Sequence, residues 1–352
     1  MSRGRILIYG ATGYTGKLLA REAARRGLDV VLAGRDRHRL DDVAHAHGYE
    51  ARAVALADGA GLRAALADVA AVLHVAGPFS ATSKPMADAC LETGTHYLDV
   101  TGEIDVFEAL ARRGEEALRA GVTLLPGVGF DVVPSDCLAV HVAKRIDEPK
   151  RLRIGLAGLG GGVSRGTART MLESLADGLR IRHQGVLVPR SFGRLEHRFD
   201  LGAGPLRALA MPLADLASAF HSTGIPNIET YVVASGSLPN MLRLAERLRP
   251  LLRVGFVRRF LEERIDRMPE GPTDDARESG RSLVLAEVEG AGGLRAAAML
   301  ETPSGYAITQ VAAVEAARRV AEGLAPIGFQ TPATAFGADF VLECSNSRRT
   351  DL

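Results

Sequence analysis

The first third of the chain alternates short apolar runs with stretches that have helical spacing. Six segments built around such runs suit strands buried on both faces: residues 6–9, 28–36, 49–56, 70–79, 95–103 and 121–136. Segments between them, such as residues 17–26, place apolar residues at helical intervals. This alternation predicts an α/β fold with a Rossmann-type doubly wound parallel sheet.

The pattern changes near residue 149, where strands follow one another through turns. The predicted strands are residues 151–158, 185–192, 194–202, 228–235, 282–290, 294–305 and 306–310. We also predict a helix over 165–181, after the N-cap residue Ser164, and another over 309–324. These elements indicate a second, α+β domain built on a mixed, largely antiparallel sheet.

The segment 240–265 is amphipathic and rich in arginine, and we expect Pro250 to break it. Two interpretations stay open. The segment lies on a membrane surface or covers a lipid tail, or it forms a solvated helix pair packed on the sheet. We favour the second.

Composition narrows the class of protein. The chain has 352 residues and a formal net charge of +1, which gives no reason to expect a nucleic-acid partner. Its three cysteines are widely separated and show neither disulfide nor metal-site spacing. No apolar stretch is long enough to span a membrane, and the first strand begins too early to leave room for a signal peptide. We therefore expect a cytoplasmic protein without a metal site.

A glycine-rich loop, "YGATGYTG", joins the first strand to the first helix. Gly10 allows a tight turn, Gly13 leaves room for a pyrophosphate, and Gly16 lets the helix pack closely on the strand. The start of the helix then offers N–H groups and a positive dipole end to phosphate. The strand before the loop and the helix after it predict a dinucleotide site.

The second strand ends in Arg35, at the position where an acidic residue usually binds the ribose of NAD. A guanidinium there favours NADP(H), because it binds a 2′-phosphate through paired hydrogen bonds. Asp36 is the alternative, as a ribose ligand. The predicted cofactor-binding residues, all at strand ends, are Gly10, Ala11, Thr12, Gly13, Tyr14, Thr15, Gly16, Arg35, Asp58, Ala76, Gly77, Pro78, Phe79 and Phe130.

Hydride transfer needs little from the protein beyond positioning, exclusion of water and one proton donor. The candidate donors are Tyr97, Asp99 and Asp131, and the alternative for each is a structural role in the adjoining turn. The second domain offers polar residues that suit a substrate carboxylate or phosphate, or turn chemistry instead: Ser164, Arg165, His221 and Asn227.

Several motifs in order resemble the saccharopine dehydrogenase-like reductases, which include saccharopine reductases and the trans-acting enoyl reductases of lipid biosynthesis. They are "YGATGYTG", "AGRD", "VAGPF", "HYLDVTGE", "PGVGFDVVPSD", "GGGVSRGTARTMLE", "FHSTGIPNIETY" and "GFQTPATAFGADFVLE". The resemblance implies a nucleotide domain interrupted by a second domain. We accordingly expect an NADP-binding domain at 1–136, a substrate and dimerisation domain at 137–326, and a C-terminal segment at 327–352 that returns to the first.

The resulting expectation is an NADP(H)-dependent reductase that holds a C=C bond of an apolar, enoyl-type substrate between its domains. The alternatives are reduction of a C=N bond, as in opine and saccharopine chemistry, and a non-catalytic NADP sensor. The expected partner is a small, lipid-like molecule. A membrane surface and a second copy of the chain remain open as further partners.

Overall fold

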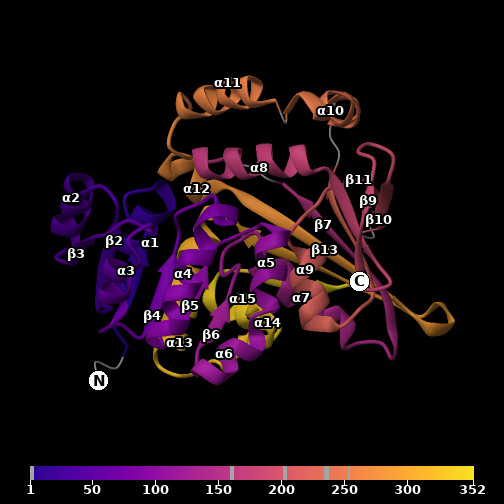
Figure 1. Ribbon diagram of the computed structural model, residues 1–352. Coiled ribbons are helices and arrows are strands. Elements are labelled where there is room, and N and C mark those ends of the chain that lie inside the picture. Colours follow the sequence, from indigo (N-terminus) through magenta and orange to yellow (C-terminus); the bar gives the residue numbers. More distant parts are fainter. Residues whose placement is uncertain (1–3, 159–161, 201–203, 234–237, 253) are drawn as a thin grey trace. The chain divides into compact units, whose positions relative to one another are not determined.

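The computed structural model describes residues 4–158, 162–200, 204–233, 238–252 and 254–352 (Figure 1). The predicted strand ends at 201–202 and 234–235 lie outside these residues. The chain forms two compact units. The first consists of Met1–Thr101, Asp105–Val133 and Tyr306–Ser345, and the second of Gly102–Ile104, Pro134–Gly305 and Asn346–Leu352.

The first unit is built on a seven-stranded sheet in the order β15-β6-β5-β4-β1-β2-β3, and every pair in it is parallel. Its strands are β1 (Ile6–Tyr9), β2 (Val30–Gly34), β3 (Glu50–Ala53), β4 (Ala71–His74), β5 (His96–Asp99), β6 (Thr123–Leu125) and β15 (Gly328–Phe329). Apart from the added β15, this is the strand order of the Rossmann fold. The order reverses between β1 and β4, so their carboxyl ends flank the expected ligand crevice.

The helices of this unit are α1 (Tyr14–Arg25), α2 (Arg37–His47), α3 (Gly59–Leu66), α4 (Phe79–Thr93), α5 (Ile104–Ala111), α6 (Gly114–Ala120), α13 (Gly305–Ala321), α14 (Pro332–Phe336) and α15 (Phe340–Cys344). The central strands β1, β2 and β4 are almost entirely apolar and fully buried, as parallel strands covered by helices must be, whereas the edge strand β3 is partly exposed. The predicted Rossmann-type fold is confirmed.

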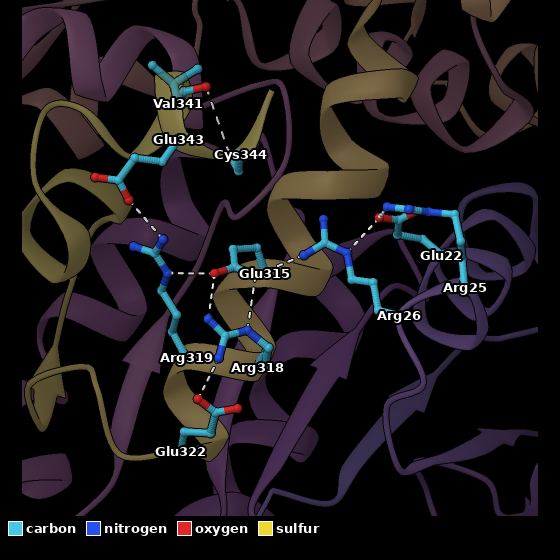
Figure 2. Close-up of polar contacts among 10 residues, drawn as sticks. All are labelled: Glu22, Arg25, Arg26, Glu315, Arg318, Arg319, Glu322, Val341, Glu343 and Cys344. Carbon is cyan, nitrogen blue, oxygen red and sulfur yellow. Dashed lines mark hydrogen bonds and ion pairs between the residues drawn. The ribbon is translucent and has the colours of Figure 1, made fainter. Parts of the chain in front are cut away.

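A network of charged side chains joins α1, α13 and α15 (Figure 2). Glu22 of α1 is buried and accepts hydrogen bonds from Arg25 and Arg26, at 2.8 and 2.6 Å. Arg26 also pairs with Glu315 of α13 at 2.8 Å. Glu315 binds Arg318 and Arg319 of its own helix, and Arg319 reaches Glu343 of α15. The pair of Arg26 and Glu315 thus joins segments that are nearly 290 positions apart in the sequence.

The second unit contains a nine-stranded sheet with the main path β10-β11-β12-β7-β13-β14-β16 and with β8 and β9 attached to β12. The strands are β7 (Pro149–Ala157), β8 (Leu179–His183), β9 (Val186–Arg190), β10 (Glu196–Asp200), β11 (Pro205–Ala210), β12 (Asn227–Val233), β13 (Arg281–Gly290), β14 (Arg295–Pro303) and β16 (Arg348–Asp351). Of these pairs, β12 with β7 is parallel and the others are antiparallel. The predicted mixed, largely antiparallel sheet is confirmed.

The helices of the second unit are α7 (Val133–Ala143), α8 (Arg165–Asp177), α9 (Asp215–Thr223), α10 (Leu238–Leu252), α11 (Gly255–Asp266) and α12 (Asp274–Ser279), with a short 3-10 turn at Ala291–Gly293. Both α10 and α11 contact α8, and Figure 1 shows them on its outer side. This unit has its own apolar core, in which Phe192, Phe199 and Tyr231 are buried.

Several predicted elements differ from the structure in type or length. Residues 306–310 are not a strand but the first turns of α13, because the helical period that buries Ile308 and Ala312 outweighs their local preference. The helix predicted over 165–181 ends at Asp177, and β8 follows. The sixth strand stops at Leu125 instead of running to 136. The segment 240–265 divides close to Pro250, as predicted: Pro250 lies in the last turn of α10, which ends two residues later, and α11 begins at Gly255.

The observed units also divide the chain differently from the expected domains. Residues 306–326, expected in the second domain, lie with the first unit, where α13 is held to α1. Residues 346–352 lie with the second unit, because β16 pairs with β14. The functional limits at 136 and 326 stay a prediction, since compactness alone does not show which segment folds independently.

Candidate functional site

The glycine-rich loop lies at the carboxyl end of β1, next to the point where the strand order reverses. The N–H groups of Gly10 and Ala11 donate to the carbonyl oxygen of Ala33 on β2, at 2.8 and 3.3 Å, and this fixes the turn. Gly13 is the N-cap of α1, and its side of the helix start is exposed. The first N–H groups of an α-helix have no acceptor within the helix, so this end can bind an anion.

The fold leaves different amounts of space for a Cβ atom at the three glycine positions of the loop. Gly10 has φ +92°, and a Cβ atom there would lie 2.9 Å from the Cβ of Ala76. At Gly16 a Cβ would lie 2.3 Å from the carbonyl oxygen of Gly10. At Gly13 the nearest atom would be 3.5 Å away, an ordinary contact, and φ is −78°. The fold therefore explains Gly10 and Gly16 but leaves Gly13 open, as a cradle for a phosphate requires.

The other loop residues support this geometry. Ala11 is buried, and Thr12 and Thr15 are half-buried. The ring of Tyr14 packs edge-on against Tyr306 at the start of α13, with 5.1 Å between centroids. The helix start is thus held by α13 as well as by the sheet.

Arg35 follows β2 and is exposed. It lies close enough to Tyr9 to oppose the burial that raises the pKa of this phenol. Asp36 caps α2 by accepting a hydrogen bond from the Arg39 N–H at 3.1 Å. The Arg39 guanidinium reaches the Thr12 carbonyl oxygen at 3.4 Å, so this arginine in the first turn of α2 contacts the glycine-rich loop.

Asp58, after β3, caps α3 by accepting a hydrogen bond from the Gly61 N–H at 2.9 Å. This contact gives it a structural role at the same edge of the sheet, and a cofactor contact stays a prediction.

The loop after β4 is held from within by Thr82. Its hydroxyl lies 2.7 Å from the Ala76 carbonyl oxygen and 3.0 Å from that of Pro78. Because the hydroxyl proton is donated to a carbonyl, Thr82 accepts the N–H of His74 Nε2 at 3.1 Å. Burial lowers the pKa of His74 to about 3, so the ring is neutral. The sequence pattern does not predict this pair, and the only signal for it is a histidine inside the apolar run "AVLHVAG".

Phe79 begins α4 and is buried in the core of the first unit, edge-on to the ring of His74 at 5.5 Å. Gly77 is exposed and Pro78 half-buried. The burial of Phe79 agrees with core packing, and a contact with a nicotinamide stays a prediction.

Asp99 ends β5 and is fully buried. Its carboxylate accepts hydrogen bonds from the Tyr97 hydroxyl at 2.6 Å and from the N–H groups of Thr101 and Gly127, both at 2.9 Å. These donors tie the end of β5 to the loop after β6. The geometry supports the structural alternative for Tyr97 and Asp99.

Phe130 and Asp131 lie in the loop between β6 and α7. The Phe130 N–H donates to the Thr309 hydroxyl of α13 at 2.9 Å. Asp131 has an exposed side chain, yet the surrounding protein raises the pKa of its carboxyl to about 6 through desolvation. The two observations disagree on how dry this group is. We give more weight to the exposed surface, because water at a carboxylate preserves its charge.

The four predicted substrate residues belong to the second unit and have partners there. The Ser164 side chain caps α8 by accepting from the Thr167 N–H at 3.2 Å, and the Arg165 guanidinium donates to the Met268 carbonyl oxygen at 2.6 Å. Asn227 accepts from the Gln184 N–H and donates to the Lys150 carbonyl oxygen, at 3.1 and 2.8 Å.

His221 lies in the last turn of α9, with its ring 5.5 Å from that of Phe220. The structure thus gives Ser164, Arg165 and Asn227 local structural roles, and substrate binding by the four stays a prediction.

The structure brings the predicted cofactor residues that follow β1, β2, β3, β4 and β6 to one edge of the first sheet. In the described part of the chain, no group of three histidine, cysteine, aspartate or glutamate residues could hold a metal ion. None of the helices described combines the length and the hydropathy that a membrane span requires.

The strand order, the open Gly13 and the helix start define a dinucleotide-binding protein of the Rossmann type. Residues 6–125 match the family described as the saccharopine dehydrogenase NADP binding domain. The resemblance predicted from the motifs is therefore confirmed.

The curated relatives that this chain matches are named as trans-acting enoyl reductases. Rv2449c of Mycobacterium tuberculosis (strain ATCC 25618 / H37Rv), named as a trans-acting enoyl reductase, is 35% identical over 190 residues, which cover 49% of this chain and 44% of that protein. The trans-acting enoyl reductase of Mycobacterium leprae (strain TN) is 33% identical over 153 residues, which cover 41% and 37%. The chain thus spans less than half of the length of these relatives.

Solved structures show the same fold over the whole chain. The apo saccharopine dehydrogenase (L-Glu forming) of Saccharomyces cerevisiae has a TM-score of 0.66 at 13% identity and covers 99% of this chain and 100% of its own. The homospermidine synthase of Legionella pneumophila, solved with NAD, has a TM-score of 0.61 at 11% identity and covers 99% and 92%. At such identities the likeness shows the fold alone.

Proposed function

We propose that this protein is an NADP(H)-dependent oxidoreductase that reduces the C=C bond of an apolar, enoyl-type substrate. The observation that carries the proposal is Gly13, a position at the start of α1 where the fold has room for a side chain and the sequence has none. A dinucleotide pyrophosphate fits this position, next to the positive end of the helix. When bound, the nicotinamide supplies the hydride.

The choice of NADP over NAD is supported by Arg35. The side chain is exposed at the end of β2, where it can reach a 2′-phosphate. Asp36, the alternative ribose ligand, already caps α2. Arg39 adds a second guanidinium beside the glycine-rich loop.

The apolar acceptor is supported by the names of the mycobacterial relatives and by the arginines of the second unit. Arg165 donates to the Met268 carbonyl oxygen, and the buried Arg182 donates to those of Leu216 and Gly185. Arginines held by backbone carbonyls are poorly placed to bind the carboxylates of an amino-acid imine.

Asp131 is the residue that we assign to the proton step. Tyr97 and Asp99 are engaged with each other and with the β6 loop, whereas Asp131 presents a carboxyl group on an exposed part of that loop. Because this carboxyl group is exposed, it can take up a proton from water and pass it to a bound substrate.

The test uses the full chain, NADPH or NADH, and three acceptors: crotonyl-CoA, trans-2-dodecenoyl-CoA, and a 2-oxo acid mixed with an amino acid as imine precursors. We expect NADPH oxidation with the enoyl thioesters, faster with the longer chain. Turnover only with the imine precursors would replace the proposal with C=N reduction. Tight NADPH binding without turnover of any acceptor would favour a non-catalytic sensor.

A further inference from the structure

The outer face of α10 and α11 carries a continuous set of exposed apolar side chains. They are Met241, Leu244, Leu248 and Leu251 on α10, Val254 between the helices, and Phe256 and Phe260 on α11. The spacing on α10 follows the helical period, so its four residues form one stripe. Phe256 is 70% exposed and Met241 61%, values far above those of core residues.

The opposite face of the pair is fixed to the protein. Leu242, on the other side of α10 from the stripe, is only 5% exposed. Two residues of α11 form ion pairs with α8. Arg258 pairs with Glu173 at 2.7 Å, and Asp266 pairs with Arg169. The two helices are therefore anchored on α8, with the apolar side chains facing solvent.

Positive charge surrounds this face. Six arginines on the pair and just after it are exposed: Arg243, Arg247, Arg258, Arg259, Arg264 and Arg267. Three of the four carboxylates on the two helices form ion pairs with arginines, namely Glu246, Glu262 and Asp266. The charge that remains is mainly basic, in a chain whose formal net charge is only +1.

We propose that α10 and α11 form a docking surface for an anionic lipid bilayer. Leucine, methionine and phenylalanine on one face with arginine beside them is the pattern of a helix that lies in the membrane interface. A second copy of the chain fits less well, because a symmetric contact would bring the arginines of both copies together. This inference does not depend on the reaction that the protein catalyses.

The first test is flotation of the full chain with vesicles. We expect binding to phosphatidylcholine vesicles that contain phosphatidylglycerol, and weak binding to phosphatidylcholine alone. Replacing Phe256 and Phe260 with serine should reduce binding by roughly tenfold or more, because each buried phenylalanine adds apolar burial. Arg259→Gln should reduce it by about fivefold at low salt, the effect expected of one basic residue at a charged surface.

A matched control comes from the same unit. Leu294, in the turn before β14, and Val186, at the start of β9, are 55% and 62% exposed and belong to neither helix, so Leu294→Ser with Val186→Ser should leave binding unchanged. All variants replace exposed side chains, and equal melting temperatures will show that each is folded.

A second test uses the absence of tryptophan from this sequence. Phe260→Trp makes a single fluorescent reporter, which should shift to shorter wavelength on addition of anionic vesicles, whereas Leu294→Trp should not. No binding by the unchanged chain, equal loss in the Leu294 and Val186 control, or no shift at position 260 would each overturn the proposal. Dissociation of a dimer by the Phe256 and Phe260 replacements, without vesicle binding, would assign this face to self-association.

Discussion

Replacing glycine with alanine should have different effects at two positions of the glycine-rich loop, on stability at Gly16 and on dinucleotide binding at Gly13. An alanine Cβ at Gly16 would lie 2.3 Å from the Gly10 carbonyl oxygen, so Gly16→Ala should destabilise the protein by about 1–3 kcal/mol. At Gly13 the fold accepts a Cβ, so Gly13→Ala should melt at the unchanged temperature. It should weaken dinucleotide binding by roughly tenfold or more, because the phosphate loses a charged hydrogen bond.

Thermal melting and calorimetric titration with NADPH measure the two effects separately. Gly255→Ala is the control, since a Cβ there meets nothing within 4 Å, and it should change neither quantity. Unchanged NADPH affinity in a folded Gly13→Ala protein would remove the phosphate cradle from the account of the site.

Arg35 carries the prediction on cofactor choice. Arg35→Ala should weaken NADPH binding by about ten- to a hundredfold, because a charged hydrogen bond contributes about 1.5–3 kcal/mol, and should leave NADH binding nearly unchanged. The loss should shrink as salt is raised, since Arg35 is exposed.

Arg37→Ala is the matched control, because Arg37 is also exposed but pairs with Asp41 at 2.8 Å. Calorimetric titrations of both variants with NADPH and with NADH measure these affinities. Equal affinity of the unchanged protein for NADH and NADPH would contradict the role of Arg35 and make Asp36 the better candidate for a ribose contact.

Among the elements, α13 connects three parts of the first unit around the site. It contacts the loop through Tyr306, the β6 loop through Thr309, and α1 through Glu315 (Figure 2). Burial alone would raise the pKa of Glu315, but hydrogen bonds from Arg318 and Arg319 outweigh it and hold the pKa at about 2.

We expect Glu315→Gln to lower the free energy of unfolding by about 2–3 kcal/mol at neutral pH, because three arginines lose a charged partner. The pKa of Glu315 is lower in the folded state than its ordinary value of 4.5. Its contribution is therefore complete above pH 4.5 and is lost as the pH falls towards 2. The variant should show a flatter loss of stability over that range.

Urea unfolding at a series of pH values measures this. Glu322→Gln is the control, because Glu322 pairs only with Arg318 in the same network and is 44% exposed, so it should cost at most about 0.5 kcal/mol. Equal effects of the two replacements would show that Glu315 behaves as a surface charge.

The sequence predicted six of the seven parallel strands, because strands covered on both faces are continuous apolar runs, and missed the two-residue β15. It failed where context decides. Residues 306–310 have strand-forming character but belong to α13, and β8 and β11 were missed because arginines interrupt their apolar pattern.

The site also contains residues whose role follows from the sequence motif and residues whose role depends on contacts distant in the sequence. The roles of Gly10 and Gly16 follow from backbone geometry, which a motif encodes. Whether a polar residue is free for chemistry depends on backbone groups brought near it by the fold. The partners of Asp99 include Gly127, 28 residues away, and no local pattern reveals such a contact.

At the scale of the whole molecule, the last residues complete both sheets. β15 pairs with β6 in the first unit, and β16 pairs with β14 in the second. Deleting residues 347–352 removes β16 alone, so it should lower the melting temperature and leave NADPH affinity unchanged. Deleting everything after Ile327 also removes β15, α14 and α15 with Glu343, so NADPH binding should weaken as well.

Differential scanning calorimetry and NADPH titration of both truncated chains test this order. Full NADPH affinity in the shorter chain would show that the nucleotide site does not depend on the C-terminal elements. Loss of NADPH binding in the chain that lacks only residues 347–352 would show that β16 supports both units.

The discontinuity of the first unit also has a consequence for biosynthesis. Its segments end at Val133 and resume at Tyr306, so a ribosome that adds about 5–20 residues per second needs roughly 10–35 s to bridge the gap. During that time one edge of β6 has no strand beside it, and Glu22 and Arg26 lack their distant acidic partner Glu315. An unpaired strand edge is a site of association between nascent chains. Slow translation or chaperone binding over this interval should therefore affect the yield of the nucleotide-binding unit more than its final stability.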